Sequence, residues 1–166
     1  MIIFNGHLYM KNELQHLSLI YGIRIILLGL TIAYLWISIY TLSYTNSREA
    51  FFWIFSYEMI VEAIIGVLVI FFSGLAFRIS LTKQILNKKN WIAAGIFWAI
   101  ATILTTALIV STVSFFNEGY KYLNIRNGIS VNKFVKPFIL ISTFGLLVFI
   151  PLGISFAYLI KRKVFS

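Results

Sequence analysis

Two glutamates, Glu58 and Glu62, have the clearest potential for chemistry in this chain. They stand four positions apart in an otherwise apolar stretch, so a helix would carry both of them on one face. An ionisable side chain inside a membrane is costly and is therefore a candidate for function. Burial and a neighbouring like charge both favour the protonated carboxyl group, so this pair could carry a proton or bind a cation. Glu62 is the better candidate, because Gly66 and Ser73 continue its helix face.

A structural role is the competing interpretation of the two glutamates. If the helix enters the membrane near Met59, Glu58 is interfacial and Glu62 lies only one turn deep. Arg48 or a lysine of a neighbouring loop could then pair with them, and no ion chemistry would follow. The sequence alone leaves both interpretations open.

Other reactive side chains are scarce. The chain contains neither Cys nor Asp, which excludes thiolate sites and removes many schemes for metal binding and phosphoryl transfer. His7 and His16 are the only histidines, and they lack a nearby carboxylate motif that would complete a metal site. No phosphate-binding glycine loop or nucleophile motif is present. We therefore expect no metal, no cofactor and no enzymatic activity.

The elements that must position these residues follow from an excess of apolar side chains. Hydrophobic residues make up 60% of the chain, charged residues make up 11%, and the mean hydropathy is +0.92. A soluble domain is charged at roughly a quarter of its positions. Because there is too little polar surface to face water, the sequence predicts an integral membrane protein whose main partner is the lipid bilayer.

Four long apolar runs indicate membrane-spanning helices. Each run has about 20 residues or more, which is enough to cross a hydrocarbon core about 30 Å thick. We predict an all-α bundle of about four transmembrane helices in one membrane domain, residues 1–166, and we expect Pro151 to kink the last helix. The predicted helices cover residues 25–44, 51–77, 91–116 and 138–160, and the longer connections are residues 78–90 and 117–137.

The basic residues predict the orientation of the chain. Its net charge is +9, and the cations stand between and beside the apolar runs rather than in a nucleic-acid-binding motif, so we expect no nucleic-acid partner. Nine cations fall on the side of the termini and five on the other, so the positive-inside rule makes both termini and the loop 78–90 cytoplasmic and the loop 117–137 external. The nine are Lys11, Arg24, Arg78, Lys83, Lys88, Lys89, Lys161, Arg162 and Lys163, and the five are Arg48, Lys121, Arg126, Lys133 and Lys136.

Small residues mark candidate helix-packing positions. Gly29 and Ala33 in the first run, and Gly95 and Ala99 in the third, have the small-xxx-small spacing that lets membrane helices approach closely. Gly66 is the corresponding candidate in the second run. Packing within one bundle is the simpler interpretation, and self-association or contact with other membrane subunits is the alternative.

Two functional hypotheses follow. The first is a non-enzymatic accessory or membrane-resident protein, indicated by four crossings and negligible mass outside the membrane. The second is a small proton- or cation-coupled transporter or channel that uses Glu62, with the hydroxyl groups of the third run along its path. The abundance of Ile, Phe, Asn and Lys is typical of AT-rich genomes and suggests an archaeal or viral origin, with residence in a host membrane if the protein is viral.

Overall fold

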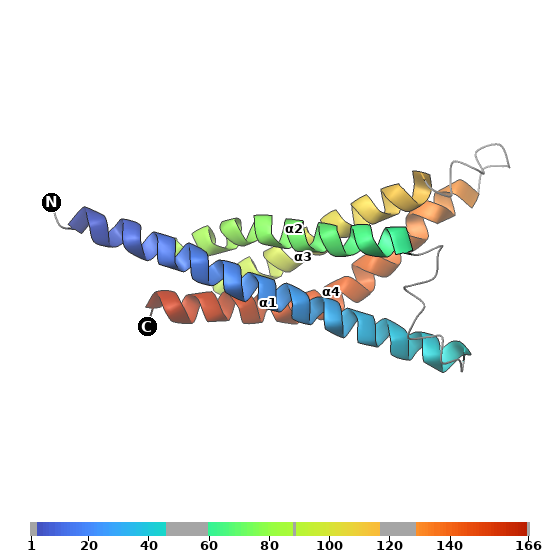
Figure 1. The fold of residues 1–166 in the computed structure, drawn as a ribbon, viewed down its shortest axis with the longest axis horizontal. Coiled ribbons are helices and arrows are strands. Elements are labelled where there is room, and N and C mark those ends of the chain that lie inside the picture. Colours follow the sequence, from blue (N-terminus) through green and yellow to red (C-terminus); the bar gives the residue numbers. More distant parts are fainter. Residues whose placement is uncertain (1–2, 46–59, 88, 117–128, 166) are drawn as a thin grey trace.

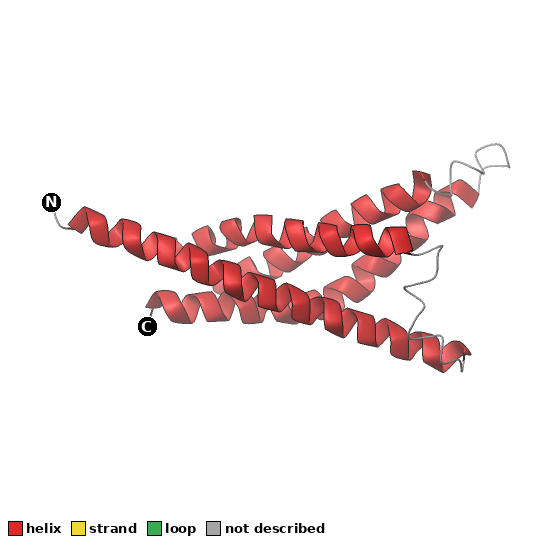
Figure 2. Cartoon of the chain, viewed as in Figure 1, coloured by secondary structure: helices red, strands yellow, loops and turns green. Residues whose placement is uncertain are grey.

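The fold is an all-α bundle of four long helices (Figure 1). The computed structural model describes residues 3–45, 60–87, 89–116 and 129–165, and none of these residues forms a strand (Figure 2). The predicted fold class is confirmed. The helices are α1 (Ile3–Thr45), α2 (Ile60–Leu86), α3 (Trp91–Ser114) and α4 (Ile129–Phe165).

Each helix contains a segment that is long and apolar enough to span a membrane. The segments have mean hydropathies from 1.9 to 2.3, and the shortest of them has 24 residues. At 1.5 Å per residue, 24 residues extend about 36 Å, which exceeds the thickness of a hydrocarbon core. The segments are Glu13–Trp36, Val61–Leu86, Trp91–Ser114 and Phe134–Val164.

Three helices extend beyond the predicted ranges. The apolar segment of α1 begins at Glu13 and not at Ile25, because a single charge such as Arg24 does not interrupt a helix whose flanking residues are mainly apolar. Helix α2 continues through Arg78 to Leu86, so the predicted loop 78–90 shortens to the connection that follows Leu86. Helix α4 begins at Ile129, within the predicted loop 117–137.

The turn between α2 and α3 ends at a side-chain cap. The Asn90 Oδ1 atom accepts hydrogen bonds from the backbone N–H groups of Ile92, at 3.0 Å, and Ala93, at 3.5 Å. These groups would otherwise have no partner at the start of α3, so Asn90 fixes where this helix begins.

Helix α3 is the central element of the bundle. In an apolar 18-residue stretch of α3, 44% of the residues are buried, against 28% in that of α1 and 11% in those of α2 and α4. Its most extensive packing is against α4 and then α2. Buried positions recur every four residues along two adjacent rows of α3, which gives it a continuous inner face. The rows are Ala94, Trp98, Thr102, Thr106 and Val110, and Gly95, Ala99, Ile103, Ala107 and Ser111.

The four helices alternate in direction, so the bundle has two distinct ends. We call the end at which α1 and α3 begin and α2 and α4 finish the terminal end, and the opposite end the far end (Figure 1). Helix α4 changes direction part-way along its length in this view. Pro151 lies inside α4 and cannot donate a backbone hydrogen bond, which accounts for a bend in the middle of the helix.

The backbones of α3 and α4 approach each other closely at two glycines. A Cβ atom added to Gly95 would lie 2.5 Å from the carbonyl oxygen of Gly153, and one added to Gly153 would meet the carbonyl oxygen of Gly95. No side chain fits between the two backbones there. Glycine at both positions therefore sets the distance between these helices.

Candidate functional site

Glu62 lies in the first turn of α2, at the far end of the bundle. Its side chain is half-buried, and its Oε2 atom is buried with no hydrogen-bond partner among the described residues. A carboxylate inside a membrane-spanning segment is costly and therefore marks a candidate functional position. Glu58, the other predicted member of the pair, lies outside the described residues.

Helix α2 turns the face that follows Glu62 toward α3. One turn after Glu62, a Cβ atom added to Gly66 would lie 3.5 Å from the Val110 Cγ2 atom. The neighbour of Val110 in sequence, Ser111, is fully buried, and its hydroxyl group also has no partner within the described part of the chain. Glu62 and Ser111 are therefore two buried polar groups, on adjacent antiparallel helices, in the half of the bundle nearer the far end.

Two other hydroxyl groups that find no partner in residues 3–45, 60–87, 89–116 and 129–165 lie in the same half of the bundle. They belong to Ser38, near the end of α1, and Ser142, in the first half of α4. Buried polar atoms normally have partners, so such a collection is unusual. Among the described residues, no hydrogen bond joins any two of these side chains, and the structure therefore does not assemble them into a coordination shell.

The other predicted hydroxyl positions are satisfied by their own helices. The Ser73 hydroxyl donates to the carbonyl oxygen of Val69 at 2.6 Å. In α3, the Thr102 hydroxyl donates to the Trp98 carbonyl oxygen at 2.8 Å, and that of Thr106 donates to the Thr102 carbonyl oxygen at 2.9 Å. Such i−4 bonds use the hydroxyl proton internally. In the predicted hydroxyl path along the third helix, Thr102 and Thr106 are thus bonded to their own helix, and Ser111 is not among these self-bonded residues.

The predicted helix-packing residues lie at different depths in the bundle. Gly29 is buried, and an added Cβ atom there would lie 2.7 Å from the Phe149 ring of α4. Gly95 lies against Gly153, and Ala99 next to it is fully buried. Ala33 and Gly66 are half-buried.

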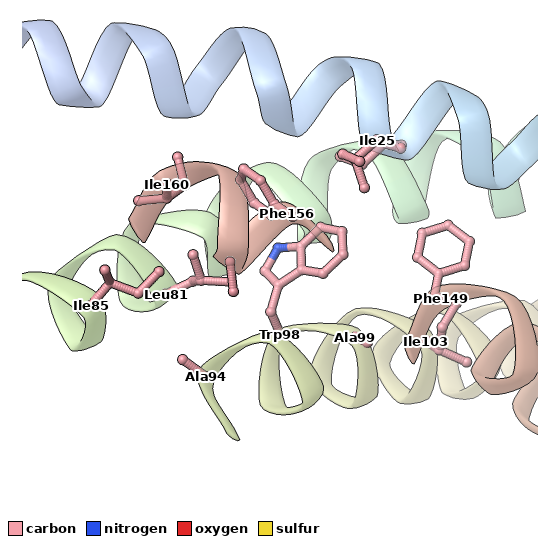
Figure 3. Close-up of a cluster of buried hydrophobic side chains, with 12 residues drawn as sticks. Ile25, Leu81, Ile85, Ala94, Trp98, Ala99, Ile103, Phe149, Phe156 and Ile160 are labelled. Carbon is pink, nitrogen blue, oxygen red and sulfur yellow. The ribbon is translucent and has the colours of Figure 1, made fainter. Parts of the chain in front are cut away.

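Trp98 is the residue that the sequence did not single out. It is fully buried, and its indole Nε1–H group donates to the backbone carbonyl oxygen of Gly74 on α2 at 2.9 Å. Its ring centroid lies 5.3 Å from that of Phe156 and 6.3 Å from that of Phe149, both on α4. Figure 3 shows Trp98 rising from α3 between these two rings, toward Ile25 of α1. Trp98 of α3 therefore contacts both α2 and α4 and belongs to the buried core that also includes Ile25 of α1.

Arg78 is the second residue whose role the sequence did not reveal. It lies inside the span of α2, and its Nη1 atom donates to the Gln15 backbone oxygen at 2.9 Å and to Ser18 Oγ at 3.0 Å, both on α1. The sequence placed Arg78 at a loop boundary because it follows a long apolar run. The apolar residues interleaved with the later lysines were the signal that the helix continues.

The histidines do not form a metal site in the described part of the chain. His16 is exposed on α1, and the side chain of His7 is not among those described. Across residues 3–45, 60–87, 89–116 and 129–165, no group of three or more His, Asp, Glu or Cys side chains lies close enough to hold a metal ion.

Comparison with known proteins finds no matching family, no matching curated protein and no matching solved structure.

Proposed function

We propose that this chain is a non-enzymatic, multi-pass membrane protein that serves as an accessory or resident component of a membrane. The observation that carries the proposal is the position of Trp98. A bulky, fully buried indole is hydrogen-bonded to α2, and two aromatic rings of α4 flank it. A packed centre of this kind supports a role in holding helices together rather than in passing a solute.

The outer surfaces of the bundle support the same role. Large apolar side chains on α2 and α4 are strongly exposed, including Phe72 at 65% and Leu147 at 66%. Apolar surface of this extent needs lipid or a membrane partner to cover it. We further propose, from the distribution of cations, that both termini are cytoplasmic.

Ion flux through proteoliposomes tests the proposal. Vesicles containing the wild-type protein are expected to conduct protons, Na⁺ and K⁺ no faster than protein-free vesicles of the same lipid, because Trp98 occludes the centre. Trp98→Ala provides the sensitivity control, since a leak that appears only in this variant would show that the assay detects an opened centre. Wild-type flux well above the protein-free level would contradict the proposal.

Purification in a mild detergent tests the accessory role. We expect the tagged chain, extracted from its native membrane, to elute with a membrane partner at fixed stoichiometry, and Glu58→Gln combined with Glu62→Gln to leave that association unchanged. A lone monomer with glutamate-dependent activity would rule out the accessory role.

A proton- or cation-coupled transporter or channel is the second candidate. The specific observation in its favour is the buried Oε2 atom of Glu62, which has no partner among the described residues. This candidate predicts wild-type flux that Glu62→Gln abolishes, because the amide cannot exchange a proton or neutralise a cation. Equal leakage from wild-type and Glu62→Gln vesicles would eliminate it.

A further inference from the structure

Arg78 carries a positive charge within the span of α2 and has no anionic partner among the described residues. Its two acceptors, the Gln15 carbonyl oxygen and the Ser18 hydroxyl oxygen, are neutral. Its Nε atom is buried and unbonded. A guanidinium group has five N–H donors, so the two donors of Nη2 remain for another ligand. A cation at this depth is costly unless an anion accompanies it.

The Arg78 side chain extends toward the terminal end of the bundle. A Cβ atom added to Gly22 would lie 3.7 Å from the Arg78 Cδ atom, while Nη1 reaches Gln15, which is nearer the start of α1. The Cα atom lies eight residues before Leu86, or about 12 Å from the end of α2. The charged head therefore points from the hydrocarbon region toward the membrane surface, in the direction that long cationic side chains follow in lipid.

A groove between α1 and α2 lies beside this head. Its volume is about 120 Å³, which is room for several water molecules or a small polar group. Arg78 and Lys83 supply its cations, and Leu14, Ile79 and Leu86 supply apolar walls. The groove thus combines two positive charges with a surface suited to hydrocarbon.

The surroundings of the groove are also cationic. Lys89 and three consecutive cations, Lys161, Arg162 and Lys163, lie at the same end, and the ammonium group of Lys161 stands 5.2 Å from the centre of the Trp91 ring. Glu13 is the one described carboxylate at this end, and it is exposed and does not line the groove. The terminal end therefore attracts an anion that the described part of the chain does not supply.

We propose that this groove binds the phosphate group of an anionic lipid headgroup. Arg78 would donate hydrogen bonds to the phosphate oxygens, and Lys83 would add a second positive charge. Ile79 and Leu86, both exposed, would contact the glycerol and the first acyl carbons. Basic pockets between helices near the membrane surface suit such headgroups, and the apolar walls favour a lipid over free phosphate. The inference stands independently of the proposed function.

A purely structural role makes a different prediction. The Arg78 bonds to α1 could serve only to fasten α1 to α2, and Lys83 is favourably placed near the carbonyl end of α2 without any ligand. A tether of this kind affects stability and not lipid preference. Lipid binding is therefore the quantity to measure.

Native mass spectrometry of the full chain in a neutral detergent can measure lipid binding. Phosphatidylglycerol and phosphatidylcholine are titrated separately against the wild type and against Arg78→Gln, Arg78→Lys and Lys83→Gln. Arg162→Gln removes an exposed cation at the same end but outside the groove, and is the matched control. Circular dichroism and elution volume establish that each variant is folded.

We expect the wild type to bind one phosphatidylglycerol in preference to phosphatidylcholine. Arg78→Gln should weaken that binding about tenfold or more, since it removes a charge-assisted contact. Arg78→Lys should be intermediate, because it keeps the charge and loses the planar donors. Lys83→Gln should weaken binding about fivefold, and Arg162→Gln by less than twofold. Equal affinity for the two lipids, or equal losses in Arg78→Gln and Arg162→Gln, would overturn the proposal.

Two further measurements test the lipid site if Arg78→Gln does not fold and if free phosphate is the true ligand. If Arg78→Gln does not fold, Lys83→Gln decides, because the described contacts of α1 with α2 do not depend on it, and unchanged lipid binding in that variant would refute the site. Inorganic phosphate is titrated alone to separate the two sources of phosphate. Binding of inorganic phosphate as tight as that of phosphatidylglycerol would show a free-phosphate site and overturn the assignment to lipid.

Discussion

At the scale of single residues, the bundle depends on a few side chains that join helices through polar atoms. Trp98 joins α3 to α2 through the carbonyl oxygen of Gly74, and Arg78 joins α2 to α1. The sequence did not predict either role. A tryptophan in a membrane helix is usually assigned to the interface. Trp98 is instead held by groups that are distant in sequence, the Gly74 carbonyl oxygen and the rings of Phe149 and Phe156.

Glu62 illustrates what the sequence can indicate about a single residue. Its type and its position in an apolar run make it a candidate, and its Oε2 atom is buried with no hydrogen-bond partner among the described residues. The face shared with Ser73 was less informative, since the Ser73 hydroxyl group is bonded to its own helix. Sequence spacing indicates which residues share a face and does not indicate where a hydroxyl proton goes.

Truncation of Trp98 tests the centre of the bundle. Trp98→Ala should lower the free energy of unfolding by about 3–5 kcal/mol, because it leaves a cavity and removes the indole hydrogen bond. Trp98→Phe should lower the free energy of unfolding by less, and the lost interhelical hydrogen bond should contribute about 0.6 kcal/mol of that decrease. Circular dichroism during denaturation in mixed micelles measures both.

Trp36→Ala is the control for this prediction. The Trp36 side chain is 56% exposed on α1, so its removal should change the free energy of unfolding by no more than about 0.5 kcal/mol. An equal cost for Trp98→Ala and Trp36→Ala would show that Trp98 is not the packed centre.

At the scale of the helices, their number was predictable and their limits were not. Lipid offers the backbone no hydrogen bonds, so four long apolar runs had to be four helices. A lipid bilayer also tolerates an isolated arginine whose guanidinium group reaches the membrane surface. For this reason neither Arg24 nor Arg78 ends its helix. The small residues were visible in the sequence, but only the structure shows that Gly95 faces Gly153.

Substitution of Gly95 tests the contact between α3 and α4. Gly95→Ala should destabilise the bundle by about 1–3 kcal/mol, because the new methyl group would lie 2.5 Å from a backbone oxygen and would force the helices apart. Gly66→Ala is a matched control in a helix of the same bundle. Its added carbon would make an ordinary 3.5 Å contact with Val110, so it should be neutral or stabilising by up to about 1 kcal/mol. Thermal unfolding in detergent compares them, and equal effects would contradict the assigned contact.

At the scale of the whole molecule, charge and apolar surface are distributed differently. Cations concentrate at the terminal end, while exposed apolar side chains cover the lengths of α2 and α4. This distribution suits a protein that crosses the bilayer four times with both termini on the side of anionic headgroups. Composition alone predicted the crossing, because it depends on total apolar surface. The groove beside Arg78 could not be predicted, because it depends on how α1 lies against α2.

Accessibility of single cysteines most directly tests whether these helices span a membrane. The chain has no Cys, so Lys89→Cys, Leu104→Cys and Lys163→Cys each place one thiol at a known position. In sealed membrane vesicles, a membrane-impermeant maleimide should label Lys89→Cys and Lys163→Cys from the same side. It should leave Leu104→Cys, which is 39% exposed on α3, unlabelled until detergent is added. Labelling of Leu104→Cys in intact vesicles as fast as Lys89→Cys would mean that water surrounds α3, and would contradict the membrane-spanning bundle.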